Sequence, residues 1–313
     1  MLRTRAFLAF RLKLQSNKTH AYHLKNYFRQ KFIQMRQTAL LLTLLLTANT
    51  LIGQQLQNQK SISPYEWNWG KDGIWTGAAL AGSVGGFLLI QNKDGIDMAK
   101  LNEELANQDD INFIDRWVVG NDSESASDIS DIPFGFSFAS PLLLLFNDNI
   151  NDHTGQVMGL YIESLATTAT LYTITAGLVN RSRPYVYSDN IDMDRRLSDS
   201  GQRSFYSGHV AASATATFFA AKIFQDFNPD SGAIPYIWTA AALVPAGVGY
   251  LRIAAGQHFL TDVLLGYGLG ALAGYYIPEW HKVKGETNFS FAPVSGRTFL
   301  GDHYQGLSVG YSF

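Results

Sequence analysis

The chain has 313 residues, of which 46% are hydrophobic and 16% are charged, with a formal net charge of −2 at pH 7. The charged fraction lies well below the roughly 25% of an ordinary soluble domain, which favours membrane contact or a deeply buried helical core. The near-neutral charge gives no reason to expect a nucleic acid partner, and the absence of cysteine excludes disulfides and thiolate metal sites.

The N-terminal region is basic and is followed by a short apolar run. Residues 1–36 carry nine Lys or Arg and no acidic residue, and the apolar run Thr38–Thr47 comes next. This run is short for a membrane span but matches the apolar region of a secretory signal peptide. We therefore predict a basic extension over residues 1–34 and a signal peptide or signal anchor over residues 35–55, with Met35 as the true start. A basic amphipathic arm on a membrane surface is the alternative.

Six long apolar segments predict helices near the length that spans a bilayer. They cover Gly73–Ile90, Ile132–Phe146, Gly155–Asn180, a segment from the N-cap Ser207 to Phe227, Ile234–Ala254 and His258–Pro278. The second helix is expected to break near Pro141 and to follow a Ser/Asp loop over Asp122–Asp131. Residues 97–118 show an amphipathic pattern. The predicted fold is all-α, a six-helix bundle that is membrane-embedded or membrane-associated.

The C-terminal tail has a different pattern. Asn288–Phe291 and Leu307–Phe313 alternate apolar and polar residues with a period of two. Such alternation is typical of strands, so we predict a short β-hairpin over residues 286–313.

Three polar clusters lie at the ends of the apolar segments. In an up-down bundle the end of the third helix, the start of the fourth, and the turn between the fifth and sixth all lie at one end. Arginines and histidines gathered at apolar helix ends are costly unless they share an anionic ligand, so this pattern predicts a phosphate site. The clusters are Arg181, Ser182, Arg183 and Pro184; Ser207, Gly208 and His209; and Arg252, His258 and Asp262.

The residue types in these clusters suit phosphoryl transfer. His258 and Asp262 are four residues apart and share a helix face, so the carboxylate can hold one imidazole nitrogen and leave the other as a nucleophile or base. His209 can act as a general acid. Ser207 and the backbone around Gly208 form an anion site at a helix N-terminus.

Two arginines complete this set. Arg183 and Arg252 offer bidentate contacts to phosphoryl oxygens. Together with the histidines they provide what phosphoryl transfer through a phosphohistidine needs without a metal.

Over roughly residues 71–281 the sequence resembles the type 2 phosphatidic acid phosphatase superfamily, which includes bacterial acid phosphatases and vanadium haloperoxidases. The family motif Arg-x5-His-x3-Asp is present as Arg252, His258 and Asp262. The resemblance implies a PAP2-like helical phosphatase domain over residues 71–281.

Two positions depart from the family motifs. Tyr206 replaces the proline of Pro-Ser-Gly-His, and Ala176 occupies the lysine position of Lys-x6-Arg-Pro. The missing lysine leaves the phosphate clamp one cation short unless Arg181 or Arg203 substitutes.

The resemblance implies that His258 attacks phosphorus, that Asp262 orients His258 and that His209 protonates the leaving oxygen. It implies no metal and no other cofactor. The predicted phosphate-binding residues are Arg183, Ser207, Gly208, Arg252 and Arg181.

The resulting hypothesis is a phosphohydrolase that acts on a phosphomonoester or pyrophosphate, on a phosphorylated lipid of the bacterial cell envelope, with membrane lipids as neighbours. A soluble bundle would favour a small phosphate ester instead. The alternatives are a vanadium-dependent haloperoxidase and a non-catalytic envelope protein with a degenerate site. Location in the membrane or the periplasm stays open, because six spans after a cleaved signal place the site in the cytoplasm, whereas an enzyme of envelope lipids is expected to face the periplasm.

Overall fold

The computed structural model describes residues 62–283, 289–297 and 302–311. The predicted basic extension over residues 1–34 and the predicted signal peptide over residues 35–55 lie outside the described residues.

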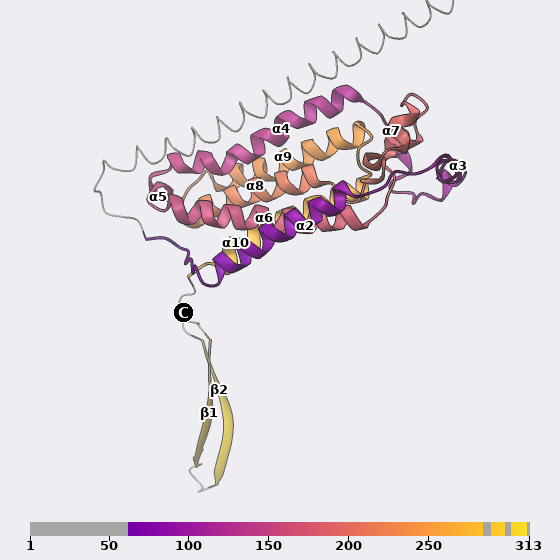
Figure 1. Cartoon of the computed structure of the whole chain (residues 1–313). Coiled ribbons are helices and arrows are strands. Elements are labelled where there is room, and N and C mark those ends of the chain that lie inside the picture. Colours follow the sequence, from indigo (N-terminus) through magenta and orange to yellow (C-terminus); the bar gives the residue numbers. More distant parts are fainter. Residues whose placement is uncertain (1–61, 284–288, 298–301, 312–313) are drawn as a thin grey trace, which may run out of the picture. The chain divides into compact units, whose positions relative to one another are not determined.

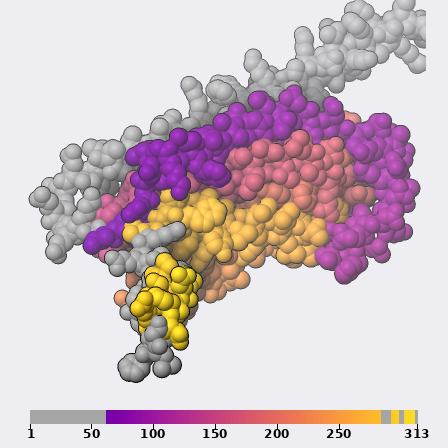
Figure 2. Space-filling view, turned by 90° about the horizontal axis from the view of Figure 1, so that it is seen from below, coloured from indigo at the N-terminus to yellow at the C-terminus, as the bar shows by residue number. Residues whose placement is uncertain are grey.

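A bundle of six long helices forms the main body, as the sequence predicts (Figure 1). α8 is the central helix: 13 of its 20 residues are buried, and α4, α6, α9 and α10 all pack against it. On the face seen in Figure 2, α6 lies between α2 and α10 and contacts both. The six helices are α2 (Asp72–Gln91), α4 (Glu124–Leu143), α6 (Thr154–Leu178), α8 (Gly208–Phe227), α9 (Ile234–Ala254) and α10 (Leu260–Trp280).

Short elements connect the long helices. Within the amphipathic stretch 97–118 the structure has α3 and two 3₁₀ turns rather than one continuous helix. The connection from α6 to α8 is likewise built from short turns. These elements are α3 (Met98–Ala106), η1 (Gln108–Asp110), η2 (Arg116–Val118), η3 (Leu144–Phe146), α5 (Asp148–Asn151), η4 (Pro184–Tyr187), α7 (Met193–Leu197) and η5 (Asp199–Gln202).

The second long helix differs from the prediction in where it starts and in its continuity at Pro141. α4 begins at Glu124, inside the predicted loop, because Ser123 caps it by accepting a hydrogen bond from a first-turn N–H. The helix also continues through Pro141 without a break. Proline removes the N–H that would bond the carbonyl of Ser137, and the hydroxyl of Ser140 donates to that same carbonyl at 2.6 Å.

Close packing of α10 on α8 brings their N-terminal ends together. Gly266, Gly270 and Gly274 are four residues apart and face α8, where a methyl group on any of them would meet a backbone carbonyl of Ser207 or of α8. Small residues at this spacing allow helix backbones to approach closely. The N–H of Ser207 consequently donates to the carbonyl of Asp262 at 3.1 Å.

Four helices in the described part of the chain are long and apolar enough to cross a membrane: α2, α4 with η3, α9 and α10. Large apolar side chains on them point outward, as Phe136, Leu243 and Leu264 do, with 71%, 64% and 59% exposure. Extended apolar surfaces of this kind mark contact with lipid or with another protein. The exposed apolar side chains of these helices account for the low fraction of charged residues in the chain.

The predicted C-terminal hairpin is confirmed. β1 (Phe289–Arg297) pairs with β2 (His303–Tyr311) in antiparallel register, from Phe289 opposite Tyr311 to Arg297 opposite His303.

Candidate functional site

The three polar clusters come together at the bundle end that carries α3 and α7 (Figure 1). The guanidinium of Arg183, just after α6, donates to the side chain of Gln257, between α9 and α10. His258 contacts the backbone of the loop that leads into α8. Residues as far apart in sequence as Arg183 and His258 therefore form one site, as the bundle topology predicts.

His258 is held with one ring nitrogen available. Its side chain is almost completely buried, and Nδ1 lies 2.7 Å from the carbonyl oxygen of Ser204. Because a carbonyl oxygen only accepts hydrogen bonds, Nδ1 carries the hydrogen and Nε2 keeps its lone pair. No hydrogen bond engages Nε2 within the described part of the chain, so this atom is free to act as a nucleophile.

Burial lowers the pKa of His258 well below its ordinary value of 6.5, and the nearby positive charges of Arg183 and Arg252 lower it further. We therefore expect the ring to stay neutral, with hydrogen on Nδ1, as the pH falls through 6.5. Ring ¹⁵N chemical shifts of histidine-labelled protein, assigned with a His258→Ala variant, would measure this. A titration near pH 6.5, or a hydrogen on Nε2 in the neutral ring, would contradict the geometry.

Two cations without carboxylate partners, the half-buried Arg183 and the buried Arg252, lie near His258. Among the described residues no ion pair joins Arg183 or Arg252 to an acid. Arg183 Nε donates to the carbonyl of Arg203 at 3.3 Å, while Arg252 Nη1 contacts Ser130 Oγ at 3.3 Å and its Nε is buried without a partner. Burying such groups is costly unless an anion satisfies them, which indicates an anion-binding site.

The N-terminal end of α8 lies at the same end of the bundle as His258, Arg183 and Arg252. Ser207 occupies the N-cap position, but its hydroxyl caps nothing and is fully buried without a partner. Together with the first N–H groups of α8, at Gly208 and His209, this hydroxyl is a donor set for an anion at a positive helix end.

His209 lies at the start of α8 and contacts residues of α4. Its Nε2 lies 3.5 Å from a carboxylate oxygen of Asp131, and its ring packs on Phe134 with ring centroids 4.2 Å apart. The side chain is one-third exposed, so it can exchange protons with solvent. Asp131 was not predicted, because it lies in α4, where the sequence predicts a loop.

Arg181 contacts two carboxylates and an aromatic ring. Its Nη2 lies 2.7 Å from Asp115, its Nη1 contacts Asp262, and its guanidinium lies 4.6 Å from the ring centre of Phe259. Both amino groups are therefore occupied by carboxylates. Arg181 neutralises two buried acids, and its role as a phosphate ligand stays a prediction.

Asp262 also differs from the prediction, which placed its carboxylate on His258. Its oxygens accept hydrogen bonds from Arg181, from the hydroxyl of Ser204 at 2.6 Å and from the N–H of Phe259 at 3.1 Å. In the described residues no hydrogen bond joins it to His258. The connection runs through Ser204, whose hydroxyl bonds Asp262 and whose carbonyl bonds His258.

Asp115 supports this network from outside the bundle helices. It accepts from the N–H of Thr261 at 2.9 Å and from its hydroxyl at 2.6 Å. Burial would raise the pKa of Asp115, but the hydrogen bonds from Thr261 and Asn112 and the contact with Arg181 outweigh it and hold the pKa below its ordinary value of 3.8. Asp115 is thus a permanent counter-ion for Arg181.

Gly256 shapes the turn that presents His258. Its φ of +64° lies in the left-handed region, and a methyl group there would overlap the carbonyl of Asn121. We expect Gly256→Ala to lower the free energy of unfolding by about 2 kcal/mol or more and to reduce activity. Thermal unfolding would measure this, with Gly247→Ala in α9 as the control, since a methyl group at Gly247 meets nothing within 4 Å. Equal stability of the two variants would contradict the expectation.

The described residues contain no group of three or more His, Asp or Glu side chains placed to hold a metal ion. The donors of the site are cationic and hydroxyl groups, which suit an anion.

Part of the chain is similar to a known protein family. The model of the PAP2 superfamily matches residues 158–286, which contain all three polar clusters. A lipid A 4′-phosphatase from Porphyromonas gingivalis is 31% identical over 99 residues, which is 31% of this chain and 39% of that relative. This chain therefore covers much less than two thirds of the length of that relative.

Two solved structures are also similar. The crystal structure of Aquifex aeolicus LpxE has a TM-score of 0.34 at 21% identity, covering 52% of this chain and 92% of that one. A transmembrane PAP2-type phosphatidylglycerolphosphate phosphatase from Bacillus subtilis has a TM-score of 0.34 at 18% identity, covering 77% of this chain and 94% of that one.

Proposed function

We propose that the chain, whose residues 158–286 match the model of the PAP2 superfamily, is a member of that superfamily and a metal-independent phosphohydrolase that removes a phosphate group from a lipid phosphate of the cell envelope. The observation that carries the proposal is the free Nε2 of His258 near the half-buried Arg183 and the buried Arg252, two cations without carboxylate partners among the described residues. A nucleophile next to an anion-binding site is the arrangement that phosphoryl transfer needs.

In the first step His258 Nε2 attacks phosphorus and the bond from phosphorus to the leaving oxygen breaks. His209 donates a proton to that oxygen, a contribution of about 10²- to 10⁴-fold in such reactions. Arg183, Arg252 and the N–H groups at the start of α8 hold the non-bridging oxygens, where negative charge is greatest.

In the second step water attacks the phosphohistidine. The neutral ring of His209 takes a proton from that water, the bond from phosphorus to Nε2 breaks, and inorganic phosphate leaves. The Ser204 carbonyl keeps the hydrogen on Nδ1 of His258 throughout, so the same nitrogen is nucleophile and leaving group.

The surface of the bundle supports a lipid substrate. Four helices in the described ranges are long and apolar enough to cross a membrane, and the site lies at one end of the bundle to which they belong. A head group at the membrane surface can then enter the site while its acyl chains stay in lipid. The similarity to a lipid A 4′-phosphatase supports the same class of substrate.

The test is phosphate release by the full-length protein in detergent, from a long-chain lipid phosphate and from a soluble aryl phosphate, with and without EDTA. A His258→Ala preparation serves as the blank. We expect lipid phosphate turnover above the blank that EDTA does not reduce. Turnover of the aryl phosphate alone would replace the lipid by a small ester. Release from neither substrate would overturn the proposal, and vanadate-dependent halide oxidation would then assign haloperoxidase activity instead.

A further inference from the structure

A tyrosine of α6 lies against the first turn of α8, where the predicted phosphate site has its backbone donors. A methyl group added at Gly208 would lie 2.6 Å from Cζ of Tyr172, the ring carbon that carries the hydroxyl, and 2.7 and 2.9 Å from the two ring carbons beside it. The phenol end of the Tyr172 ring therefore lies directly over the backbone of Gly208, whose N–H is one of the free donors at the start of α8.

The face of α6 that carries Tyr172 points towards α8. Thr168 lies four residues earlier, on the same helix face, and its hydroxyl is 2.8 Å from the hydroxyl of Thr215 in α8. Tyr172 is nevertheless only half-buried. Because α8 begins at Gly208, no turn of that helix covers the ring on the side of the site. The open side of Tyr172 is therefore the side on which the phosphate is expected to bind.

The hydroxyl of Tyr172 is not used to hold the fold together. In the described part of the chain no hydrogen bond engages it, whereas the hydroxyl of Tyr161, in the same helix, donates to the carbonyl of Phe138 at 3.3 Å. A tyrosine hydroxyl can donate one hydrogen bond and usually finds a partner when packing fixes its ring. The hydroxyl of Tyr172 is thus available to a ligand.

Two neighbours place this hydroxyl among the phosphate-binding groups. The Tyr172 ring packs edge-on against Tyr206, the residue before Ser207, with ring centroids 5.8 Å apart. Burial lowers the pKa of Arg183, and the phenol groups of Tyr185 and Tyr172 act in the opposite direction. A neutral donor at this position adds a hydrogen bond to the anion without adding repulsion between cations.

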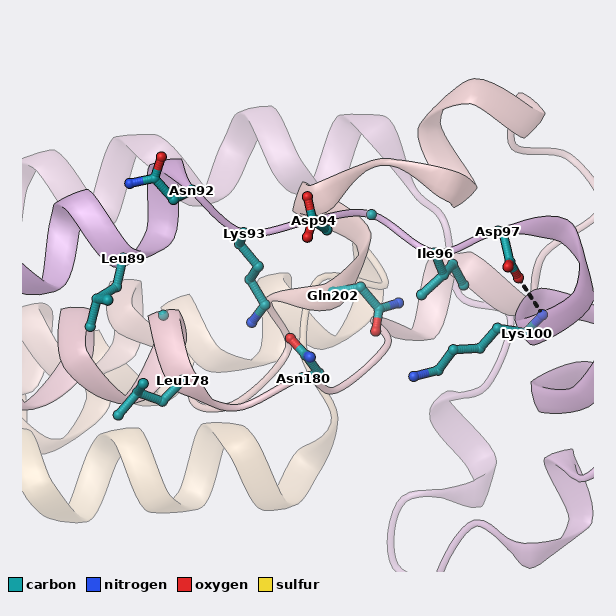
Figure 3. A pocket seen from close by; sticks show the side chains of 12 residues that line it. Leu89, Asn92, Lys93, Asp94, Ile96, Asp97, Lys100, Leu178, Asn180 and Gln202 are labelled. Carbon is teal, nitrogen blue, oxygen red and sulfur yellow. Dashed lines mark hydrogen bonds between the residues drawn. The ribbon is translucent and has the colours of Figure 1, made fainter.

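A separate cavity at the end of α6 is the competing place for an anion. Figure 3 shows Lys93, Lys100 and Gln202 at its wall, and its volume is about 470 Å³. Lys93 donates to the carbonyl of Ala176 at 2.8 Å. The described residues that line this cavity include neither Tyr172 nor any predicted phosphate-binding residue. An experiment on phosphate binding can therefore separate the two places by substitution.

We propose that the hydroxyl of Tyr172 donates a hydrogen bond to a non-bridging oxygen of the phosphate group, beside the N–H groups at the start of α8. The inference deepens the proposed function and rests on it, since it assigns a further ligand to the same phosphate group. Tyr172 makes this contact before and during the reaction and transfers no proton. It strengthens binding, and the nucleophile remains His258.

A packing role for the ring makes a different prediction. The ring closes the space over Gly208, and phenylalanine closes it equally well. Tyr172→Phe removes one oxygen atom that bonds nothing in the described fold, so its unfolding temperature should equal that of the unchanged protein. If the ring acts by packing alone, affinity for phosphate is unchanged as well.

The experiment measures orthophosphate binding to the full-length protein in detergent by calorimetry, together with thermal unfolding. We expect Tyr172→Phe to bind orthophosphate about 10-fold more weakly, as for the loss of one hydrogen bond to an anion. KM for the lipid phosphate should rise by a similar factor, while kcat changes by less than about threefold.

Two control variants accompany Tyr172→Phe. Tyr161→Phe makes the same substitution in the same helix, away from α8's first turn, and Lys100→Ala removes a charge from the cavity of Figure 3. Both should bind orthophosphate within about twofold of the unchanged protein, because a lost hydrogen bond outside the site changes stability and not affinity.

Unchanged orthophosphate binding in Tyr172→Phe, or no binding to the unchanged protein, would overturn the proposal. An equal loss in Tyr161→Phe would do the same, and a loss in Lys100→Ala alone would assign the bound phosphate to the cavity of Figure 3. Binding needs no turnover, so the two proposals can fail separately. A chain that binds orthophosphate through Tyr172 but releases no phosphate from any ester keeps this assignment and loses the proposed hydrolysis. A chain with turnover and an indifferent Tyr172 does the reverse.

Discussion

Replacing His258 with alanine is expected to lower kcat for phosphate release by about 10⁴-fold or more, since a covalent route has no substitute for its nucleophile. The ring is buried and its Nε2 makes no hydrogen bond among the described residues, so the proposed mechanism depends on this nitrogen. Initial rates of phosphate release would measure the loss. Brief incubation with ³²P-labelled lipid phosphate, followed by quenching in alkali, should trap label on the unchanged protein and none on His258→Ala.

The matched control is His303→Ala, because His303 lies in β2 and not in the bundle. It should keep both turnover and label. Label that survives in His258→Ala would show that another residue forms the covalent intermediate. Equal unfolding temperatures of the two variants would establish that lost turnover does not come from lost folding.

The sequence was sufficient to place the functional groups at one end of the molecule. Bundle topology follows from apolar segments joined by short connections, and this alone brings Arg183, Ser207 and His258 together. Hydropathy also located α9 with both ends correct, because Ile234–Ala254 is bounded by polar or glycine-containing turns. These features depend on local composition, which a single sequence contains.

Partners contributed by other segments could not be predicted. Ser204 holds His258 through a backbone carbonyl, and every residue type carries such a carbonyl. Asp115 lies among many acids in an amphipathic stretch, and nothing local distinguishes the one that bonds Arg181. Lys93 reaches Ala176 across 83 positions of sequence. Each of these contacts exists only because the tertiary fold brings the segments together.

The predictions of a loop before α4 and of a break at Pro141 were wrong, because side-chain hydrogen bonds stabilise the helix at both positions. The start of α4 appeared as a loop because serine and aspartate favour turns, yet the same residues cap helices. A break was expected at Pro141, but the hydroxyl of Ser140 bonds the carbonyl that proline leaves free. Composition predicts which secondary structure a segment favours, but a single side-chain hydrogen bond can decide which structure it forms.

Replacing Asp262 with asparagine is expected to damage both folding and catalysis. The carboxylate is fully buried and neutralises Arg181, whose side chain is 25% exposed, so removing the charge of Asp262 leaves the guanidinium with Asp115 alone. Breaking a fully buried pair costs about 3–5 kcal/mol in the free energy of unfolding, and the partial exposure of Arg181 lowers this cost. Thermal or denaturant unfolding in detergent would measure it.

The catalytic effect of Asp262→Asn should appear in kcat rather than in KM. Ser204 connects the carboxylate to His258, so a loosened Ser204 hydroxyl moves the carbonyl that positions Nδ1. A displacement of about 1 Å at a nucleophile costs roughly 100-fold in rate. Affinity for orthophosphate changes little, because Arg183 and Arg252 do not contact Asp262 in the described residues.

Two further variants separate positioning through Ser204 from direct contact with the ring. Ser204→Ala removes the hydroxyl that bonds Asp262 and should lower kcat in the same direction. Thr261→Val removes hydrogen bonds to Asp115 and Arg181 but none to Ser204, so it should lower stability and leave kcat within a few fold. If kcat falls in Asp262→Asn and stays unchanged in Ser204→Ala, the carboxylate acts on His258 directly during catalysis, as the i, i+4 spacing first suggests. A loss in both, with Thr261→Val active, establishes Ser204 as the link that holds the nucleophile.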